Sequence, residues 1–373
     1  MRVAVIGGGV VGLSIAWRLS RRHDVTIFDP APGRGASWAA AGMLAPAGEA
    51  WHGEEPLLHA GLDSLSRWPD FAAELTAASG IDPWLAPEGT WMVGATDDDG
   101  AEVARVVSLL QSHGLSTHRL ARSDVRAAEP ALHPRLSTVV DVPGDLSVHN
   151  RRLLQALLRA CASAGVRMVE DRADIVVEDG RATGVRPRGS GALSAADVVV
   201  AAAGSRLAEI AGLPPELATV CRPVKGQILR LHTPHPLLTR TVRALVHGMS
   251  VYAVPRRDGE IVLGATSEEH GYDEAVTVDA VHDLLRAGVA VVPGLRDCEL
   301  VETLARSRPC TPDNTPLAGA TGVDGLLVAG GHYRGGVLLA PLTAATIQAQ
   351  IEQAPVPEAA LAFSPERLTG ARR

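Results

Sequence analysis

Residues 1–19 read MRVAVIGGGVVGLSIAWRL, and this stretch predicts a buried strand, a glycine-rich turn and an amphipathic helix in direct succession. In that arrangement Gly7 permits the tight turn, Gly9 lets the backbone approach a pyrophosphate, and Gly12 allows close packing of helix on strand. The N-terminus of the helix offers backbone amides without partners and the positive end of the helix dipole. The stretch therefore predicts that a dinucleotide binds with its phosphates over the first helical turn.

Asp29 follows the second predicted strand, Val25–Phe28. Its distance along the chain from the glycine turn is close to the roughly 20 residues expected for an acid that binds ribose hydroxyls. Such a carboxylate repels a 2′-phosphate, which favours FAD or NAD over NADP. An aspartate before Pro30 is also typical of a turn, so the sequence leaves a purely structural role open.

The composition limits the classes of function. A chain of 373 residues exceeds the usual size of one domain, which predicts two domains. The net charge of −7 argues against nucleic-acid binding, because that binding needs a basic surface. No uninterrupted apolar run of about 18 residues occurs, so we expect no membrane attachment. Lys225 is the only lysine, which argues against a pyridoxal enzyme.

The four cysteines are Cys161, Cys221, Cys298 and Cys310. They lack the Cys-x-x-Cys spacing of zinc sites and show no disulfide framework. We therefore expect no metal site, and a reducing cytoplasm fits the chain. Chemistry on a small molecule is the class of function that composition favours.

The spacing of apolar residues predicts strands that alternate with helices, which indicates an α/β fold. The predicted helices are 58–78, 100–113, 150–164, 278–290 and 336–352. The predicted strands are 89–95, 166–169, 197–204, 224–231, 250–254, 261–266, 299–305 and 325–331, with a hairpin turn at 179–180. We expect the strands between 220 and 310 to form an antiparallel sheet beside the nucleotide-binding unit, and the proline-rich end after 353 to lie on the surface.

Four segments together resemble the D-amino-acid-oxidase-type flavoproteins, and within them the glycine oxidases of thiamine biosynthesis. The segments are Gly7–Gly12, Ser37–Leu44 (SWAAAGML), Pro223–Gln227 (PVKGQ) and Gly331–Pro341 (GHYRGGVLLAP). The resemblance extends over nearly the whole chain, and the two longer motifs are more specific than the glycine fingerprint. It implies a Rossmann-like FAD-binding domain of the glutathione-reductase type, formed by 1–85, 145–219 and 306–373. An antiparallel-sheet substrate domain would comprise 86–144 and 220–305.

The resemblance implies contacts to FAD from several parts of the chain. The implied residues are Gly7, Gly9, Val10, Val11, Gly12, Asp29, Pro30, Ala36, Ser37, Ala41, Gly42, Met43, Ala173, Gly204, Gly331, His332, Tyr333, Arg334, Gly335, Gly336, Val337 and Leu338. Ser37 has a second interpretation, as the cap of a helix that begins at Trp38. Cys310 lies in the general region of the cysteine that binds flavin covalently in related oxidases, but its spacing fits poorly. We therefore expect Cys310 to be a buried thiol and FAD to be non-covalent.

Three residues are implied in substrate binding. Arg308 matches the family position that binds the substrate carboxylate, for which a guanidinium offers two parallel hydrogen bonds. Tyr252 matches a tyrosine whose hydroxyl reaches the same carboxylate, and Arg334 could orient the flavin ring or the substrate. Arg306 is a rival of Arg308, since strand alternation places both on one face. Gly335 departs from the family, which usually has asparagine there, and the small Ser250 and Ser267 leave the pocket volume open.

The implied reaction is the oxidative deamination of glycine, with sarcosine and small D-amino acids as further candidate substrates. A hydride would pass to flavin N5, and the products would be an imine or glyoxylate, ammonia and hydrogen peroxide. His332 is expected to contact flavin through its backbone and not to act as a base. The imine would supply the thiazole of thiamine, which makes a thiazole synthase a possible partner, and the resemblance suggests a homotetramer. The alternatives are an oxidase or dehydrogenase of another small amine, a flavoprotein that passes electrons to a quinone or another protein, and a non-catalytic nucleotide-binding regulator.

Overall fold

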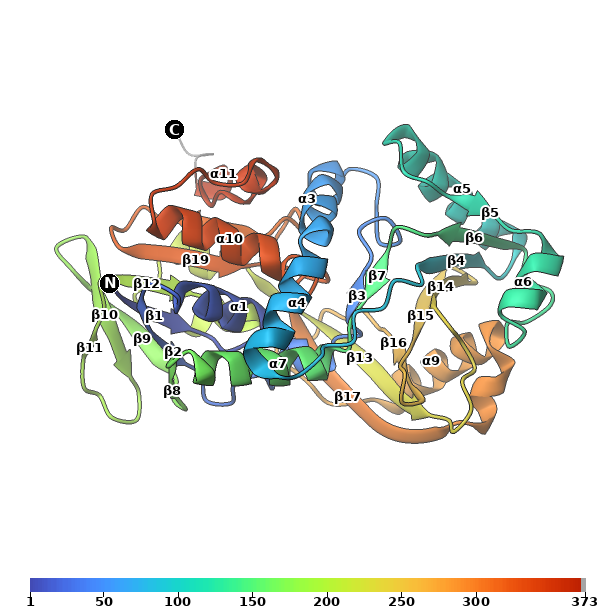
Figure 1. The fold of residues 1–373 in the computed structure, drawn as a ribbon, viewed down its shortest axis with the longest axis horizontal. Helices are drawn as coiled ribbons and strands as arrows, with labels where there is room; N and C mark the ends of the chain where they lie inside the picture. Colours follow the sequence, from blue (N-terminus) through green and yellow to red (C-terminus); the bar gives the residue numbers. More distant parts are fainter. Residues whose placement is uncertain (370–373) are drawn as a thin grey trace.

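The computed structural model describes residues 1–369, and two sheets form its two halves (Figure 1). The first sheet has six strands in the order β18-β19-β12-β1-β2-β8. Its strands are β1 (Arg2–Ile6), β2 (Asp24–Phe28), β8 (Arg167–Val169), β12 (Val198–Ala201), β18 (Leu317–Ala320) and β19 (Leu326–Gly330). All neighbours pair in parallel except β18 and β19, which pair antiparallel. The predicted strand–turn–helix–strand unit at the N-terminus is confirmed.

Side chains of β1 alternate between two apolar cores. Val3 and Val5 pack against the helices α1 (Val10–Leu19), α7 (Asn150–Ser163) and α10 (Ala340–Ile351). Ala4 and Ile6 pack on the opposite face of the sheet. That face is covered by a three-stranded sheet of β9 (Ala173–Glu178), β10 (Arg181–Pro187) and β11 (Ser194–Ala195), with the hairpin turn where the sequence predicts it. Burial on both faces explains the continuous apolar run of β1.

The second sheet has eight strands in the order β17-β13-β16-β15-β14-β4-β6-β5. Its strands are β4 (Thr90–Gly94), β5 (His118–Arg119), β6 (Thr138–Val142), β13 (Arg222–His232), β14 (Thr241–Val246), β15 (Met249–Pro255), β16 (Glu260–Gly264) and β17 (Glu299–Cys310). The expected antiparallel order fails at one place, because β14 and β4 pair in parallel. They come from separate excursions of the chain, so no tight hairpin dictates their direction.

Shorter elements connect the two sheets and cover them. They are α2 (Ala36–Ala39), β3 (Met43–Leu44), α3 (Glu55–Ser66), α4 (Trp68–Ser79), α5 (Asp97–Ser112), α6 (Arg122–Ala128), β7 (Leu146–Ser147), α8 (Pro215–Ala218), α9 (Val278–Val291) and α11 (Glu366–Thr369), with 3₁₀ turns η1 (Gly204–Glu209), η2 (Pro293–Asp297) and η3 (Glu358–Phe363). Helix α9 packs its apolar face on the eight-stranded sheet. None of the helices in the described part of the chain is both long and apolar enough to cross a membrane.

Four predictions about elements are corrected by the structure. The helix expected at 58–78 is two helices, α3 and α4, because Pro69 lies in the first turn of α4 and lacks an amide to continue α3. The helix expected from 336 begins only at Ala340, after a series of turns. Among the strands of the two large sheets, β5, β6, β14 and β18 were not predicted. The C-terminal end is not merely superficial, since Phe363 is fully buried in the core around α1 and α10.

The proposed division into two domains remains a prediction. Strand β17 runs across the boundary at 305–306 and therefore connects the two parts directly.

Gly12 gives a test of the packing between α1 and β1. A Cβ atom at this position would lie 2.0 Å from the carbonyl oxygen of Gly7, so the helix would have to move. We expect Gly12→Ala to lower the free energy of unfolding by about 1–3 kcal/mol, as overpacked cores do, measured by urea denaturation. Gly144→Ala is the control, because a Cβ there would meet no atom within 4 Å. Equal stability of the two variants would contradict the tight contact.

Candidate active site

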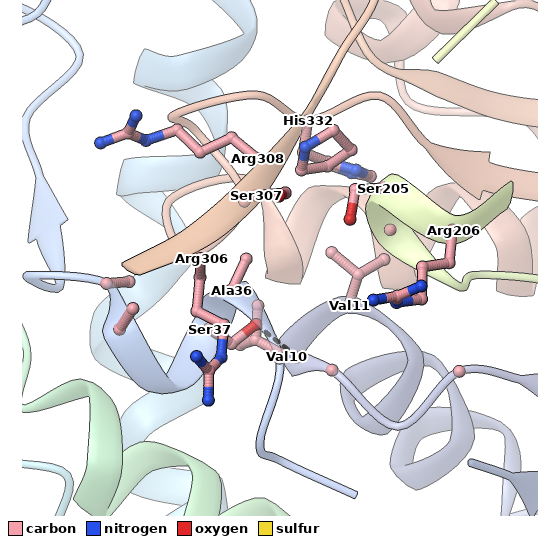
Figure 2. A pocket seen from close by; sticks show the side chains of 18 of the residues that line it. Val10, Val11, Ala36, Ser37, Ser205, Arg206, Arg306, Ser307, Arg308 and His332 are labelled. Atoms are coloured by element: carbon pink, nitrogen blue, oxygen red, sulfur yellow. Dashed lines mark hydrogen bonds between the residues drawn. The ribbon is translucent and has the colours of Figure 1, made fainter. Parts of the chain in front are cut away.

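A cavity of about 680 Å³ lies between the two sheets, at the carboxyl ends of β1 and β2 (Figure 2). Its size is within the range of ligand sites. Most of the residues that the sequence implicates line it: Gly7, Gly9, Val10, Val11, Asp29, Pro30, Ala36, Ser37, Ala41, Gly42, Met43, Ala173, Gly204, Tyr252, Arg308, His332, Tyr333, Arg334, Gly336 and Val337. The structure does not place Gly12, Gly331, Gly335 or Leu338 on the cavity wall.

The first turn of α1 presents free amides to the cavity. The amide of Val10 donates to Oγ of Ser37 at 3.1 Å, which Figure 2 marks. Among residues 1–369 the amides of Val11 and Gly12 have no acceptor, as expected for the start of a helix. A Cβ on Gly9 would meet only Oγ of Ser37, at 3.5 Å, so Gly9 leaves open space beside these donors. The turn therefore has both the hydrogen-bond donors and the room for a phosphate group.

Ser37 does not cap its own helix. Its helix, α2, begins at Ala36 and has Gly35 as the N-cap, without a side-chain cap. The Ser37 hydroxyl instead accepts from the first residue of α1. The segment around Ser37 is thereby attached to the glycine turn, which is 27 residues away in the sequence.

Asp29 lines the cavity directly after the carboxyl end of β2. One of its carboxylate oxygens accepts from the amide of Gly8 at 2.6 Å, and the other accepts from Ala31 at 2.7 Å. The second contact is the turn role that the sequence left open. Ala173, the first residue of β9, and Arg172 also line the cavity. A role for Asp29 toward ribose remains compatible with these contacts, because each carboxylate oxygen has a further lone pair.

The loop 331–339 forms another wall, and its position is fixed by buried hydrogen bonds. His332 is buried, and its Nε2 lies 2.9 Å from Oγ1 of Thr343. Burial lowers the pKa of His332 to about 4, so the ring is neutral near pH 7. The carbonyl of Leu338 accepts from Oγ of Ser64 at 2.6 Å and from Nε1 of Trp68 at 2.9 Å. The His332 ring thus holds the loop in place.

Arg306 and Arg308 have different environments, although the sequence could not separate them. Arg306 forms an ion pair with Glu274 at 3.3 Å and donates to the carbonyl of Arg34. Arg308 donates to the carbonyl of Thr266 at 3.1 Å and has no carboxylate partner within the described part of the chain. In Figure 2 the two side chains extend in different directions from β17, Arg306 toward Ser37 and Arg308 away from it.

Two glycines make room for the polar groups of the second sheet. A Cβ on Gly226 would lie 2.4 Å from three guanidinium atoms of Arg308, so the guanidinium rests directly on the Gly226 backbone. A Cβ on Gly264 would lie 2.4 Å from the hydroxyl oxygen of Tyr252. That hydroxyl has no hydrogen-bond partner among residues 1–369, and burial raises its pKa. Tyr252 is therefore a protonated donor near pH 7.

Arg334 is already engaged in the structure. It forms an ion pair with Glu54 and donates to the carbonyl of Glu49 at 3.3 Å. Its charge is balanced by that carboxylate, which makes it a weaker candidate than Arg308 for capturing an anion. Cys310 is buried and donates to Oδ1 of Asn314 at 3.1 Å, and it is not placed on the cavity wall.

Several cavity residues were missed by sequence reasoning. They include Glu49, Arg206, Arg243, Thr266, Glu274 and Ser307. They lie in loops or in strands such as β14 that no motif marks. The alternation of Val242, Arg243 and Ala244 is a weak strand pattern that could have indicated one of them.

Residues 2–350 match the family model named DAO, which describes FAD-dependent oxidoreductases. The chain belongs to this family of FAD-dependent oxidoreductases.

Two relatives of this FAD-dependent oxidoreductase have informative names. The chain is 33% identical over 371 residues to the glycine oxidase of Geobacillus kaustophilus, covering 98% of this chain and 96% of that protein. It is 34% identical over 384 residues to the bifunctional protein ThiO/ThiG of a Synechocystis species, covering 98% of this chain but 54% of the relative. The crystal structure of the Geobacillus enzyme superposes with a TM-score of 0.87 over 97% of this chain and 98% of that one.

The residues of this FAD-dependent oxidoreductase fit the cofactor of its family. The free amides of α1 and the space beside Gly9 suit a pyrophosphate. Gly42, which has φ +74° and no side chain, lines the cavity between Ala41 and Met43, and the carbonyl of Ala41 accepts from the Arg256 guanidinium. The part of the cavity beside the glycine turn therefore has a lining that suits FAD.

Gly9 separates binding of the cofactor from folding. Because a Cβ there meets only the Ser37 hydroxyl, Gly9→Ala should leave the free energy of unfolding nearly unchanged while occupying space needed by the pyrophosphate. We expect the Kd for FAD to rise by at least about tenfold, which corresponds to about 1.4 kcal/mol. Titration of the apoprotein with FAD, followed by flavin fluorescence, measures it. The Gly144→Ala variant is again the control, and an unchanged Kd would exclude this site for the phosphates.

Proposed function

We propose that the protein is an FAD-dependent glycine oxidase. The observation that supports this most directly is the convergence of Arg308 and the Tyr252 hydroxyl, neither paired with an anion, on the cavity that the glycine turn of α1 also lines. Full-length similarity to a protein named glycine oxidase supports the same conclusion. The reaction converts glycine, dioxygen and water into glyoxylate, ammonia and hydrogen peroxide.

The chain's own residues bind and orient the substrate. The planar guanidinium of Arg308 can donate two parallel hydrogen bonds to a carboxylate, and Tyr252 can donate a third. Arg308 stays in place because it donates a hydrogen bond to the carbonyl of Thr266 and its guanidinium packs on the backbone of Gly226. Such fixed positioning lowers the entropic cost of bringing substrate and cofactor together.

FAD supplies the electron acceptor when bound, and dioxygen regenerates it. No general base is proposed on His332, because its ring is neutral, buried and bonded to Thr343. The cofactor contacts that we propose are the implicated residues on the cavity wall, with Asp29 and Ala173 at the adenosine end and Ala41, Gly42 and loop 331–339 at the flavin end. Implicated residues that do not line the cavity, such as Gly12, act through packing.

We further propose that the imine product supplies a thiazole synthase. The support is the ThiO/ThiG relative, in which a region similar to this whole chain is joined to further sequence. The proposed location is the cytoplasm, consistent with four free cysteines. The homotetramer suggested by the resemblance is a separate proposal, and light scattering on the purified protein measures it.

The alternative is an oxidase or dehydrogenase of another small amine. Assays of peroxide formation with glycine, sarcosine, D-alanine and D-proline separate the two functions, since the absence of peroxide with all four substrates would favour the alternative. Reduction by glycine without air, followed by very slow reoxidation in air, would indicate a dehydrogenase.

Arg308 is the most direct test of the proposed reaction. We expect Arg308→Ala to raise the KM for glycine by about 100-fold, because a charge-assisted pair of hydrogen bonds is lost, while FAD stays bound. Steady-state peroxide assays and the visible flavin spectrum give both readouts. Arg257→Ala is the control, since Arg257 is exposed and does not line the cavity. If Arg306→Ala raised the KM for glycine more than Arg308→Ala does, Arg306 and not Arg308 would be the residue that binds the substrate carboxylate.

A further inference from the structure

A second guanidinium without an ion-pair partner lies on the cavity wall. Arg243 of β14 pairs in register with Tyr252 of β15, so their side chains are direct neighbours on one face of the sheet. Both residues line the cavity. Arg243 donates to the carbonyl of Gly48, and no carboxylate within residues 1–369 forms an ion pair with it. Most of its donors are therefore free for a ligand.

Arg243 is not needed for a single carboxylate. Arg308 and Tyr252 already provide three donors to that group, whereas glycine has no second anionic group for Arg243. Burial lowers the pKa of Arg243, and the nearby Glu49 and Asp145 act in the opposite direction; the guanidinium keeps its proton in proteins. Arg243 and Ser250 also border a smaller cavity of about 40 Å³, so the wall behind them is not filled.

Glu49 adds a negative charge to the same region. Its carboxylate lines the cavity and forms no ion pair among the described residues. The loop that carries it is fixed by Asp145, whose carboxyl group accepts from the amide of Ala47 at 3.2 Å and from that of Gly48 at 2.9 Å. Asp145 is fully buried, so Glu49 is attached to a rigid support.

These side chains leave a defined pattern of charge. Arg306 is balanced by Glu274, and Arg334 by Glu54. Around β14, β15 and β17, the charged cavity residues among 1–369 without ion-pair partners are then Arg308, Glu49 and Arg243, two positive and one negative. Arg34 and Asp29 also lack ion pairs within this part of the chain, but they line the cavity beside the glycine turn. A ligand with two carboxylates and one ammonium group has the complementary set of charges. A zwitterionic glycine would leave one positive charge without an anion.

We propose that Arg243 is a specificity-determining residue that binds a second carboxylate, and that the enzyme oxidises amines carrying two carboxylates in addition to glycine. Arg308 and Tyr252 bind the carboxylate next to the reacting carbon, Arg243 binds the distal carboxylate, and Glu49 faces the incoming ammonium group. N-carboxymethylglycine (iminodiacetate) and D-aspartate are members of this class. This proposal rests on the proposed function only for the oxidation step, because the recognition of two carboxylates can be measured by binding alone.

The kinetic test compares substrates that differ by one carboxylate. Iminodiacetate is paired with sarcosine, and D-aspartate with D-alanine. For whichever dicarboxylate is oxidised faster, we expect Arg243→Gln to lower kcat/KM by at least about tenfold more than it lowers kcat/KM for the matching monocarboxylate. Arg243→Lys should restore part of the loss, because it returns the charge. Arg257→Gln, outside the cavity, should leave all four values unchanged.

The binding test needs no turnover. Diglycolate and methoxyacetate are ethers with the shapes of iminodiacetate and sarcosine, and they lack the amine that is oxidised. We expect diglycolate to bind the FAD-loaded wild-type protein at least about tenfold more tightly than methoxyacetate, measured by calorimetry. Arg243→Gln should abolish that difference. Circular dichroism and the flavin spectrum check that the variant is folded and carries FAD.

The outcomes separate the two proposals. If diglycolate binds no better than methoxyacetate, or if Arg243→Gln weakens both equally, the second carboxylate site is wrong. If diglycolate binds through Arg243 but no amine gives peroxide, the site stands and the proposed oxidase function fails. If glycine is oxidised and neither dicarboxylate is, the function stands and the substrate class fails.

Discussion

The backbone amides in the first turn of helix α1 have no hydrogen-bond acceptors within the helix, and the arrangement of the molecule depends on this constraint. Among residues 1–369, Ser37 accepts from the amide of Val10, and the amides of Val11, which lines the cavity, and of Gly12 behind it have no acceptor. Strand β1, covered on both faces, holds the helix start at the edge of the sheet, so the site for an anionic cofactor is a consequence of how the chain begins.

The N-terminal unit could be predicted from the sequence because all of its information is local. A short apolar strand, a turn with four glycines and a helical repeat lie within residues 1–19, and the structure confirms the strand as β1 and the helix as α1. The resemblance added the loop 331–339 as a flavin contact, but not its geometry. The helix after it begins at Ala340 and not at 336, because the residues between are needed for the turns and hydrogen bonds that hold the loop.

The candidate substrate site was less predictable, since its chemistry depends on which charges remain without partners. Arginines are abundant in this chain, and alternation along β17 gives Arg306 and Arg308 the same expected face. They differ through Glu274, which comes from a loop more than 30 residues earlier and neutralises only Arg306. A contact made over such a distance along the chain is invisible to motif and periodicity. Arg243, in contrast, lies beside Tyr252 through the short antiparallel pairing of β14 with β15, but no motif marks β14.

The contact between Arg308 and the bare backbone of Gly226 has an evolutionary consequence. With the guanidinium resting where a Cβ would be, these two positions on neighbouring strands cannot vary independently. A side chain at 226 is compatible only with a shorter residue at 308, and that exchange removes the arginine. Divergence toward substrates without a carboxylate would therefore have to alter both positions together. In a collection of related sequences this coupling should appear as correlated loss of the glycine and the arginine.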